Sequence, residues 1–155
     1  MRKTYRVLGY LLALEVVIQA MAMAYGTSGL SHWVLEEDGV LNKQVRESDD
    51  IPFTEVVGFI VHGMNGMMLI PLLALILLIV SFFAKVPGGT KWAGILFGLV
   101  VVQVLLGINA SGLPFLGLLH GLNAFAIFAT AVVAARAASA VPVASSVGTR
   151  ADASV

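Results

Sequence analysis

Residues 56–84 read VVGFIVHGMNGMMLIPLLALILLIVSFFA, and this stretch decides the fold class. It contains no Asp, Glu, Lys or Arg. A helix needs about 20 apolar residues to cross a bilayer, so the stretch is long enough to span a membrane as a helix. Its strongly polar side chains, His62 and Asn65, lie close to its start and need an explanation.

Three more apolar segments of similar character occur along the chain. The 155 residues fit one domain, and 59% of them are hydrophobic while only 12% are charged, against about a quarter charged in soluble proteins. We predict an all-α membrane protein in which residues 1–137 form a bundle of four transmembrane helices. The expected helices are about 7–25, 56–84, 92–110 and 114–135. These segments lack a polar face, which argues against a soluble helical bundle.

The distribution of charge predicts the orientation of the chain. If four helices are threaded, one side receives Arg2, Lys3, Arg6, Lys85, Lys91, Arg136 and Arg150. By the positive-inside rule, both termini are cytoplasmic and the polar loop 26–55 lies outside a plasma (inner) membrane. The tail, residues 138–155, lacks helical periodicity and is expected to be a flexible cytoplasmic extension.

Charge and cysteine content exclude several classes of function. The formal net charge is zero, which argues against a nucleic-acid partner. The chain contains no cysteine, so disulfides, thiolate metal sites, iron–sulfur clusters and covalently attached c-type haem are excluded.

Two short phrases repeat along the chain. HGMNG at 62–66 in the second predicted helix parallels HGLNA at 120–124 in the fourth, and VVIQ at 16–19 in the first parallels VVVQ at 100–103 in the third. We therefore predict a bundle built from two repeated helical hairpins. Since each hairpin runs outward and back, a pseudo-twofold axis would lie along the membrane normal.

The repeat places four polar side chains at one depth. A rise of about 1.5 Å per residue puts His62 and His120 each roughly 10 Å from the outer ends of their helices, and Gln19 and Gln103 at a similar level. Unpaired polar groups in hydrocarbon cost several kcal/mol, so these side chains should face the bundle interior.

Two converging imidazoles indicate a haem site. If the second and fourth helices lie across the diagonal of the bundle, His62 and His120 point at its axis and can clamp a haem iron from both faces. The glycines that follow them, Gly63 and Gly121, would leave room for a flat macrocycle, as would Gly58, Gly66 and Gly117. The amides of Gln19, Gln103, Asn65 and Asn123 would fix the outer imidazole nitrogens or reach a propionate.

Glu15 is the only acidic residue within a predicted span, one turn deeper than Gln19 on the same face. An intramembrane carboxyl group is a candidate proton carrier or a partner for an imidazole. The alternative is a protonated packing residue that only makes hydrogen bonds. The third histidine, His32, is expected to be a solvated surface residue of the outer loop.

The polar layer and its glycines are also compatible with simple helix packing and with copper binding. Small residues four apart, at Gly94/Gly98 and Gly117/Gly121, are typical of close helix packing in lipid, and the polar residues could be interhelical hydrogen-bonding groups. Thioether and imidazole together suit Cu(I), and Met21, Met23, Met64, Met67 and Met68 all lie near the polar layer. Methionine is also a flexible filler against irregular surfaces such as a macrocycle.

The repeated histidines resemble those of small four-helix membrane b-type cytochromes and, more narrowly, one half of the haem A synthase family. In that family a four-helix unit carries histidines on its second and fourth helices, which implies that His62 and His120 are the ligand pair and that the fold covers residues 5–137. The family has two such bundles and a Glu close before a His. This chain has one bundle, with Glu55 seven residues before His62, so haem A synthesis by this chain alone is not expected.

The expected function is a membrane subunit that binds haem b near the outer face and passes single electrons between a quinone or partner redox centre and an outside acceptor. Iron held by two histidines has no open position, so the chain would not be a complete enzyme alone, although it could belong to an oxidoreductase. One alternative is a cofactor-free accessory subunit of a larger respiratory-type membrane complex. A Cu(I)-binding protein is another, and a homo-oligomer is compatible with each.

Overall fold

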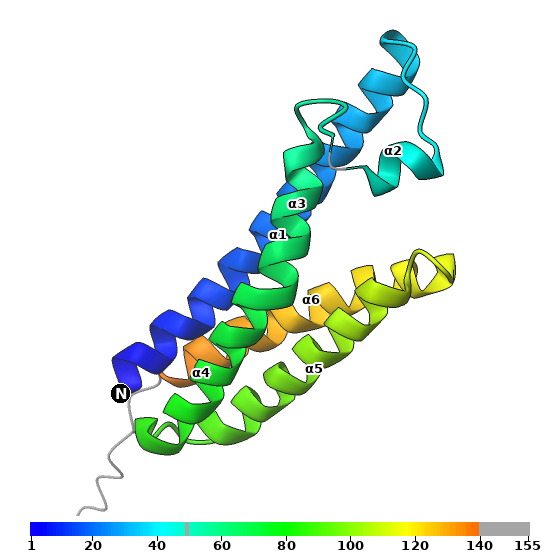
Figure 1. The fold of residues 1–155 in the computed structure, drawn as a ribbon. Helices are drawn as coiled ribbons and strands as arrows, with labels where there is room; N and C mark the ends of the chain where they lie inside the picture. Colours follow the sequence, from blue (N-terminus) through cyan, green and yellow to red (C-terminus); the bar gives the residue numbers. More distant parts are fainter. Residues whose placement is uncertain (49, 140–155) are drawn as a thin grey trace, which may run out of the picture.

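The computed structural model describes residues 1–48 and 50–139, and this part of the chain is helical with short connections (Figure 1). The elements are α1 (Arg2–Glu36), α2 (Lys43–Glu47), α3 (Val56–Met64), the π-helix η1 (Asn65–Leu69), α4 (Ile70–Ala84), α5 (Gly89–Asn109) and α6 (Pro114–Ala137). Since α3, η1 and α4 follow one another without a break, they form one span. Four helical segments are long and apolar enough to cross a membrane, which confirms the predicted fold class.

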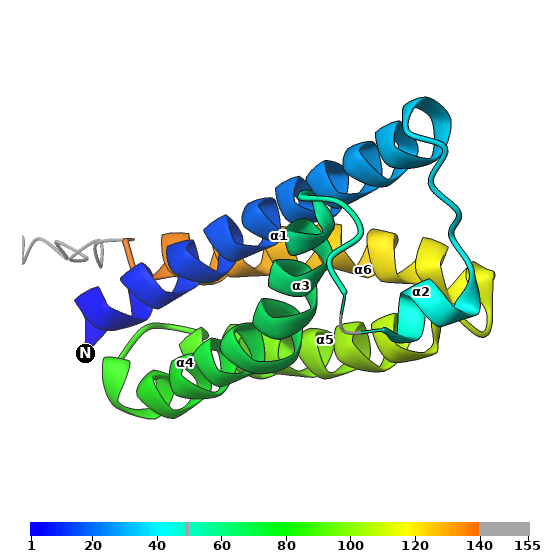
Figure 2. The same ribbon diagram turned by 45° about the horizontal axis from the view of Figure 1, so that its top comes forward.

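The four spans are arranged as a ring. α1 packs against α3, α4 and α6, while α5 packs against α4 and α6 (Figure 2). The second and fourth spans therefore occupy opposite corners of the bundle, and so do the first and third. This arrangement is the one that lets histidines on the second and fourth spans face each other.

The core lies toward one end of the bundle, here called the terminal end, which holds the start of α1, the end of α6 and the 85–88 turn (Figure 1). The largest fully buried side chains are Tyr5, Leu12, Leu77, Leu96 and Val100. Alanines on all four spans are also buried there and let the helices approach closely. The hydroxyl of Tyr5 donates a hydrogen bond of 2.8 Å to the carbonyl of Gly89, which ties the start of α1 to the start of α5.

The other end, here called the loop end, holds residues 37–55 and the 110–113 turn. Toward the loop end, α1 and α3 stay in contact with each other and diverge from α5 and α6 (Figures 1 and 2). Glycines bring α1 and α3 into contact: a Cβ on Gly58 would meet the carbonyl of Ala22, and one on Gly26 would lie 2.9 Å from the ring of Phe59. The second span therefore passes from a position beside α5 to a position on α1.

The π-helix η1 lies within this second span. Its amide–carbonyl bonding reaches one residue farther than in an α-helix, as in the bond from the Ile70 N–H to the Asn65 carbonyl. Pro71 follows at the start of α4. The proline ring crowds the carbonyl four residues earlier, and a widened turn before it relieves that crowding, although the missing N–H of Pro71 still leaves one carbonyl without its helical donor.

The first span is longer than predicted. Residues 26–36, expected to belong to the outer loop 26–55, continue α1 as far as Glu36. Gly26 and Gly29 do not end the helix because they serve as contact points with α3 and the residue before it, where side chains of Phe59 and Glu55 lie against them. The loop proper covers residues 37–55, carries α2, and is held to α1 by stacking of Trp33 on Phe53 with ring centroids 5.5 Å apart.

Other boundaries differ by a few residues. α5 begins at Gly89 instead of 92, and α6 ends at Ala137 instead of 135. The predicted flexible tail 138–155 begins inside the bundle, because Ala138 is buried and its carbonyl accepts a 2.9 Å hydrogen bond from Arg2 Nε. The remainder of that tail, 140–155, lies outside the described residues. The side of the membrane that each end faces stays a prediction.

Candidate ligand-binding site at the histidine pair

The two histidines are held in the same way in the two halves of the chain. His62 Nδ1 lies 3.2 Å from the backbone carbonyl of Gln19 on α1, and His120 Nδ1 lies 3.1 Å from the backbone carbonyl of Gln103 on α5. A carbonyl only accepts hydrogen bonds, so each Nδ1 is the protonated nitrogen. The two copies of the repeated sequence thus make equivalent contacts in the structure.

This contact leaves Nε2 of each ring available. When Nδ1–H donates to a carbonyl, the neutral imidazole carries its lone pair on Nε2, the usual state of a metal-ligating histidine. Neither His62 nor His120 makes a further hydrogen bond through Nε2 within residues 1–48 and 50–139.

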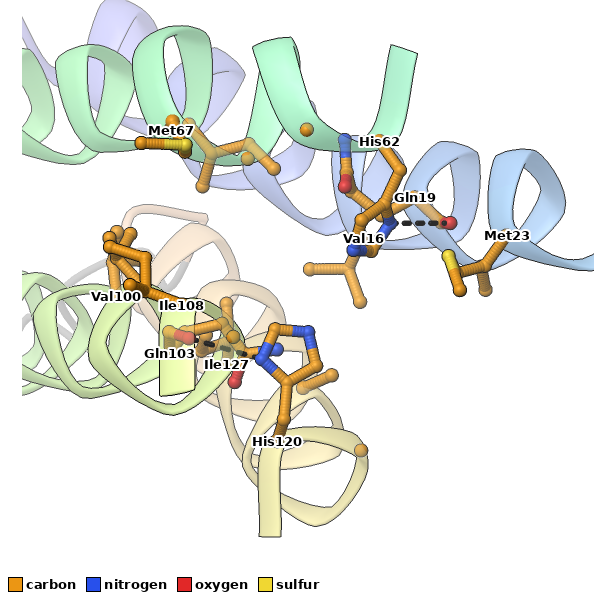
Figure 3. Close-up of a pocket in the computed structure, with 18 of the residues that line it drawn as sticks. Val16, Gln19, Met23, His62, Met67, Val100, Gln103, Ile108, His120 and Ile127 are labelled. Atoms are coloured by element: carbon orange, nitrogen blue, oxygen red, sulfur yellow. Dashed lines mark hydrogen bonds between the residues drawn. The ribbon is translucent and has the colours of Figure 1, made fainter. Parts of the chain in front are cut away.

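The two rings face each other across the bundle. Their centroids are 6.0 Å apart and their planes are inclined by 57°. Figure 3 shows the rings extending from opposite walls into a shared space, with the hydrogen bond from each Nδ1 directed back toward the wall. Both side chains are partly buried.

The space between them is a cavity of about 480 Å³ to which all four spans contribute. The polar side chains in its lining are His62, His120, Gln19 and Gln103, and the other lining residues are apolar or glycine. Val100, Ile127 and Ile70 close it toward the terminal end, where the buried core begins. Its volume lies within the range of about 300–1,000 Å³ that is common for sites of small organic ligands.

The glycines that follow the histidines keep this cavity open. Gly63, Gly66 and Gly121 line it, and a Cβ added to Gly63 or Gly121 would meet no atom within 4 Å. Gly58 and Gly117, also expected to make room for a ligand, do not line the cavity. Gly58 instead permits the contact between α1 and α3.

Gly107 is a site residue that the sequence pattern did not single out. A Cβ there would lie 3.0 Å from Cε1 of His120 and 3.2 Å from its Nδ1, so only glycine lets the ring lie directly against α5. The sequence spacing could have indicated Gly107, because it lies four residues after Gln103 and therefore on the same helix face.

The glutamine and asparagine amides do not hold the imidazoles, which was one of the two roles predicted for them, and their contact with a propionate stays a prediction. Backbone carbonyls do so, because the close approach of the paired helices brings the main chain within reach of Nδ1. Asn123 donates through Nδ2 to the Leu99 carbonyl at 2.9 Å and to Gln103 Oε1 at 2.7 Å. Asn65, at the start of η1, makes no equivalent side-chain bond among the described residues.

The two halves of the chain therefore differ in the polar contacts next to their histidines. In the second half the Gln103 side chain is paired with Asn123, whereas in the first half Gln19 Nε2 is buried without a partner in the described part of the chain. Glu15, one turn along α1, is only 7% exposed, and its Oε2 is likewise unpartnered among those residues. Glu15 itself does not line the cavity, although its neighbour Val16 does.

Several other predicted residues lie elsewhere. His32 is exposed at the loop end of α1, with Nε2 3.4 Å from Glu37 Oε1, as expected for a surface histidine. Of the five methionines near the polar layer, Met23 and Met67 line the cavity, while Met21, Met64 and Met68 do not. Gly94 and Gly98 contact no neighbouring helix within the described residues, so they do not provide the close helix packing that their spacing indicates.

The fold and the site define a multi-pass, four-helix membrane protein with an apolar cavity between two histidines. Residues 52–110 match a protein family described as a family of unknown function (DUF6220). The matched segment includes His62, Gln103 and Gly107 and ends before His120. No curated protein and no solved structure matches the chain.

Proposed function

We propose that the protein is a membrane-embedded electron-transfer subunit that binds haem b between His62 and His120. The observation that carries the proposal is the separation of the two rings. A metal ion about 2 Å from one nitrogen of each of two imidazoles sets their centroids roughly 6 Å apart, and the observed value is 6.0 Å. Each imidazole can turn about its bond to a metal, so the 57° inclination is compatible with this arrangement.

The number of protein ligands favours haem over a bare ion. Among the described residues, no three His, Cys, Asp or Glu side chains come together in a metal-binding group. A bare ion would thus receive two nitrogens from these side chains, fewer than the four ligands of a usual protein site. A haem iron already has four macrocycle nitrogens and needs two axial ligands, which is the number that His62 and His120 supply.

The cavity suits a flat, mostly apolar group. Gly63 and Gly121 form the walls beside the histidines, where no atom obstructs the space. Apart from Gln19 and Gln103, the remaining lining is aliphatic, glycine, methionine or Phe125. Such walls hold a macrocycle by contact. Met23 and Met67 can adapt to its edge because methionine is flexible.

The residues of the chain have distinct roles in this proposal. The Gln19 and Gln103 carbonyls orient the two rings and fix their tautomers, and Gly107 sets the position of His120. A haem bound in this way supplies one-electron oxidation and reduction without an open position for substrate. The chain would act as a carrier between a donor and an acceptor, such as a quinone or a redox subunit in the same membrane, rather than as a complete enzyme.

A visible difference spectrum tests the proposal. The full chain, expressed with haem available and purified in detergent, should give a reduced-minus-oxidised b-type spectrum with about one haem per chain. Replacing either ring, in His62→Ala or His120→Ala, should lower the haem content at least tenfold because one axial ligand is lost. His32→Ala is the matched control and should keep the full spectrum, because His32 lies at the exposed end of α1.

The same preparation separates the alternatives. A colourless protein that is fully inserted and contains no metal would overturn the haem proposal and support the cofactor-free accessory subunit. Copper bound in place of haem would support the Cu(I) alternative. In that case the copper should disappear when Met23 and Met67 are replaced, since these methionines line the cavity with the histidines.

A further inference from the structure

Glu15 is a buried carboxyl group that the haem proposal does not use. It lies on α1 within a membrane-spanning helix, is 7% exposed, and has no hydrogen-bond partner for Oε2 among the described residues. An ionised carboxylate without a partner is among the most costly groups to place in an apolar interior. A proton on the carboxyl removes most of that cost.

A second polar atom without a partner lies one turn away. Gln19 Nε2 is also buried and unpartnered in the described part of the chain. The Gln19 side chain lines the cavity, and its Oε1 would be 3.5 Å from a Cβ on Gly66. Gln19 is therefore the polar residue of the cavity lining that lies one turn from Glu15 on α1.

The neighbouring span offers a third polar group at this level. Gln19 faces Gly66, and α1 runs antiparallel to the second span, so Glu15 lies at the level of the last residues of η1 and the start of α4. Pro71 has no N–H, so the carbonyl of Gly66 or Met67 has one helical donor fewer. π-helical turns of this kind often occur at functional sites.

We propose that Glu15 is a proton-binding site inside the membrane, which exchanges its proton with water that enters from the cavity beside Gln19. Its ligand is a single proton, and its acceptor in the uncharged state is the carbonyl exposed by η1 or the oxygen of a water molecule. The site is separate from the histidine pair and does not require that haem is bound. The failure of either proposal thus leaves the other standing.

The charged surroundings of Glu15 are sparse. η1 and α4 (Asn65–Ala84) carry no titratable side chain. On the other elements packed against α1, His62 and His120 lie toward the loop end, with Glu55 beyond them, while Arg136 and Lys85 lie at the terminal end. Among the described residues, no cation on these elements is placed to neutralise an ionised Glu15, which leaves the proton as the available counter-charge.

Infrared spectroscopy of the full chain in lipid vesicles tests this proposal. At neutral pH the protein should show the carbonyl stretching band of a protonated carboxylic acid. The band should move to lower frequency in D₂O. Glu15→Gln should lack the band, and Glu55→Gln, which alters a partly exposed carboxyl group at the start of α3, should keep it.

The exchange route has its own measurement. Gln19→Leu keeps the size of the side chain but removes its amide, and it should slow the D₂O shift of the Glu15 band at least tenfold. Carboxylate bands alone at neutral pH would overturn the proposal. So would a band that does not shift in D₂O, since Glu15 would then be a sealed packing residue. The isotope shift is measured on the unaltered chain, so it decides the question even if Glu15→Gln does not fold.

Discussion

At the scale of single residues, the histidines are positioned by the main chain. Each Nδ1 is bound to the carbonyl of a glutamine on the adjacent helix. Any residue at position 19 or 103 would supply a carbonyl, so the glutamine side chains serve other purposes. The amide oxygen of Gln103 accepts a hydrogen bond from Asn123, whereas Gln19 lines the cavity and its Nε2 has no partner among the described residues. Equivalent residues of the repeat thus have different roles.

The unequal bonding of the two asparagines predicts unequal effects on stability. Asn123→Ala removes two interhelical hydrogen bonds, to Leu99 and Gln103, and should destabilise the fold by about 1 kcal/mol, because such bonds in membrane proteins contribute about 0.6–2 kcal/mol. Asn65→Ala, the matched control, should lower the free energy of unfolding by less than half as much. Thermal unfolding in detergent measures both, and equal shifts would contradict the assignment of these bonds.

The contact between Gly107 and His120 predicts an effect on ligand binding. Gly107→Ala places a Cβ about 3 Å from the imidazole ring, so the ring must shift and its bond to the Gln103 carbonyl must lengthen. We expect haem content to fall several-fold while the chain still inserts. Gly98→Ala on the same helix is the control: its Cβ meets nothing within 4 Å, and haem content should be unchanged.

At the scale of elements, the second span consists of two parts that are joined at η1 and have different packing roles. Its α4 part packs beside α5 in the core, and its α3 part lies on α1 and carries His62. The widened turn at η1 changes which face of the helix points inward between these parts. A continuous α-helix over the same residues would give His62 a different direction relative to the core.

The position of α3 depends on the closest helix contact at the loop end. A side chain at Gly58 would collide with the carbonyl of Ala22 and the backbone of Gly26, which cannot move aside as a flexible side chain can. Gly58→Leu should therefore destabilise the protein by about 1–3 kcal/mol, the usual cost of overpacking. His62 follows one turn later, so haem content should fall as well.

Thermal unfolding and the difference spectrum check this prediction together. Gly94→Leu is the matched control, because Gly94 faces open space on α5. If Gly58→Leu behaved like this control, the close packing of α1 on α3 would be wrong.

At the scale of the whole molecule, the spans and the convergence of the histidines could be predicted, because long apolar segments and a repeated polar phrase are visible in the sequence. The length of α1 could not, since Gly26 and Gly29 are usual loop residues and only the contacts with Phe59 and Glu55 explain their place in a helix. The carbonyl contacts of the histidines were missed because every residue carries the same main-chain groups.

The orientation of the whole chain can be tested directly because it contains no cysteine. A single cysteine at Lys43, in α2 at the loop end, should react with a membrane-impermeant maleimide on intact cells. One at Ser139, at the terminal end, should react only after the membrane is opened. The reverse pattern would invert the predicted topology and leave the bundle unchanged.

The unequal distribution of packing also bears on how the protein is assembled. Most of the large buried side chains and the Tyr5–Gly89 hydrogen bond belong to the terminal end, away from the cavity, and only Val100 among the largest also lines it. The helices can therefore associate in the bilayer before any prosthetic group arrives. In the proposed haem protein, insertion of the cofactor would then be the final maturation step, performed on an already assembled bundle from its less constrained side.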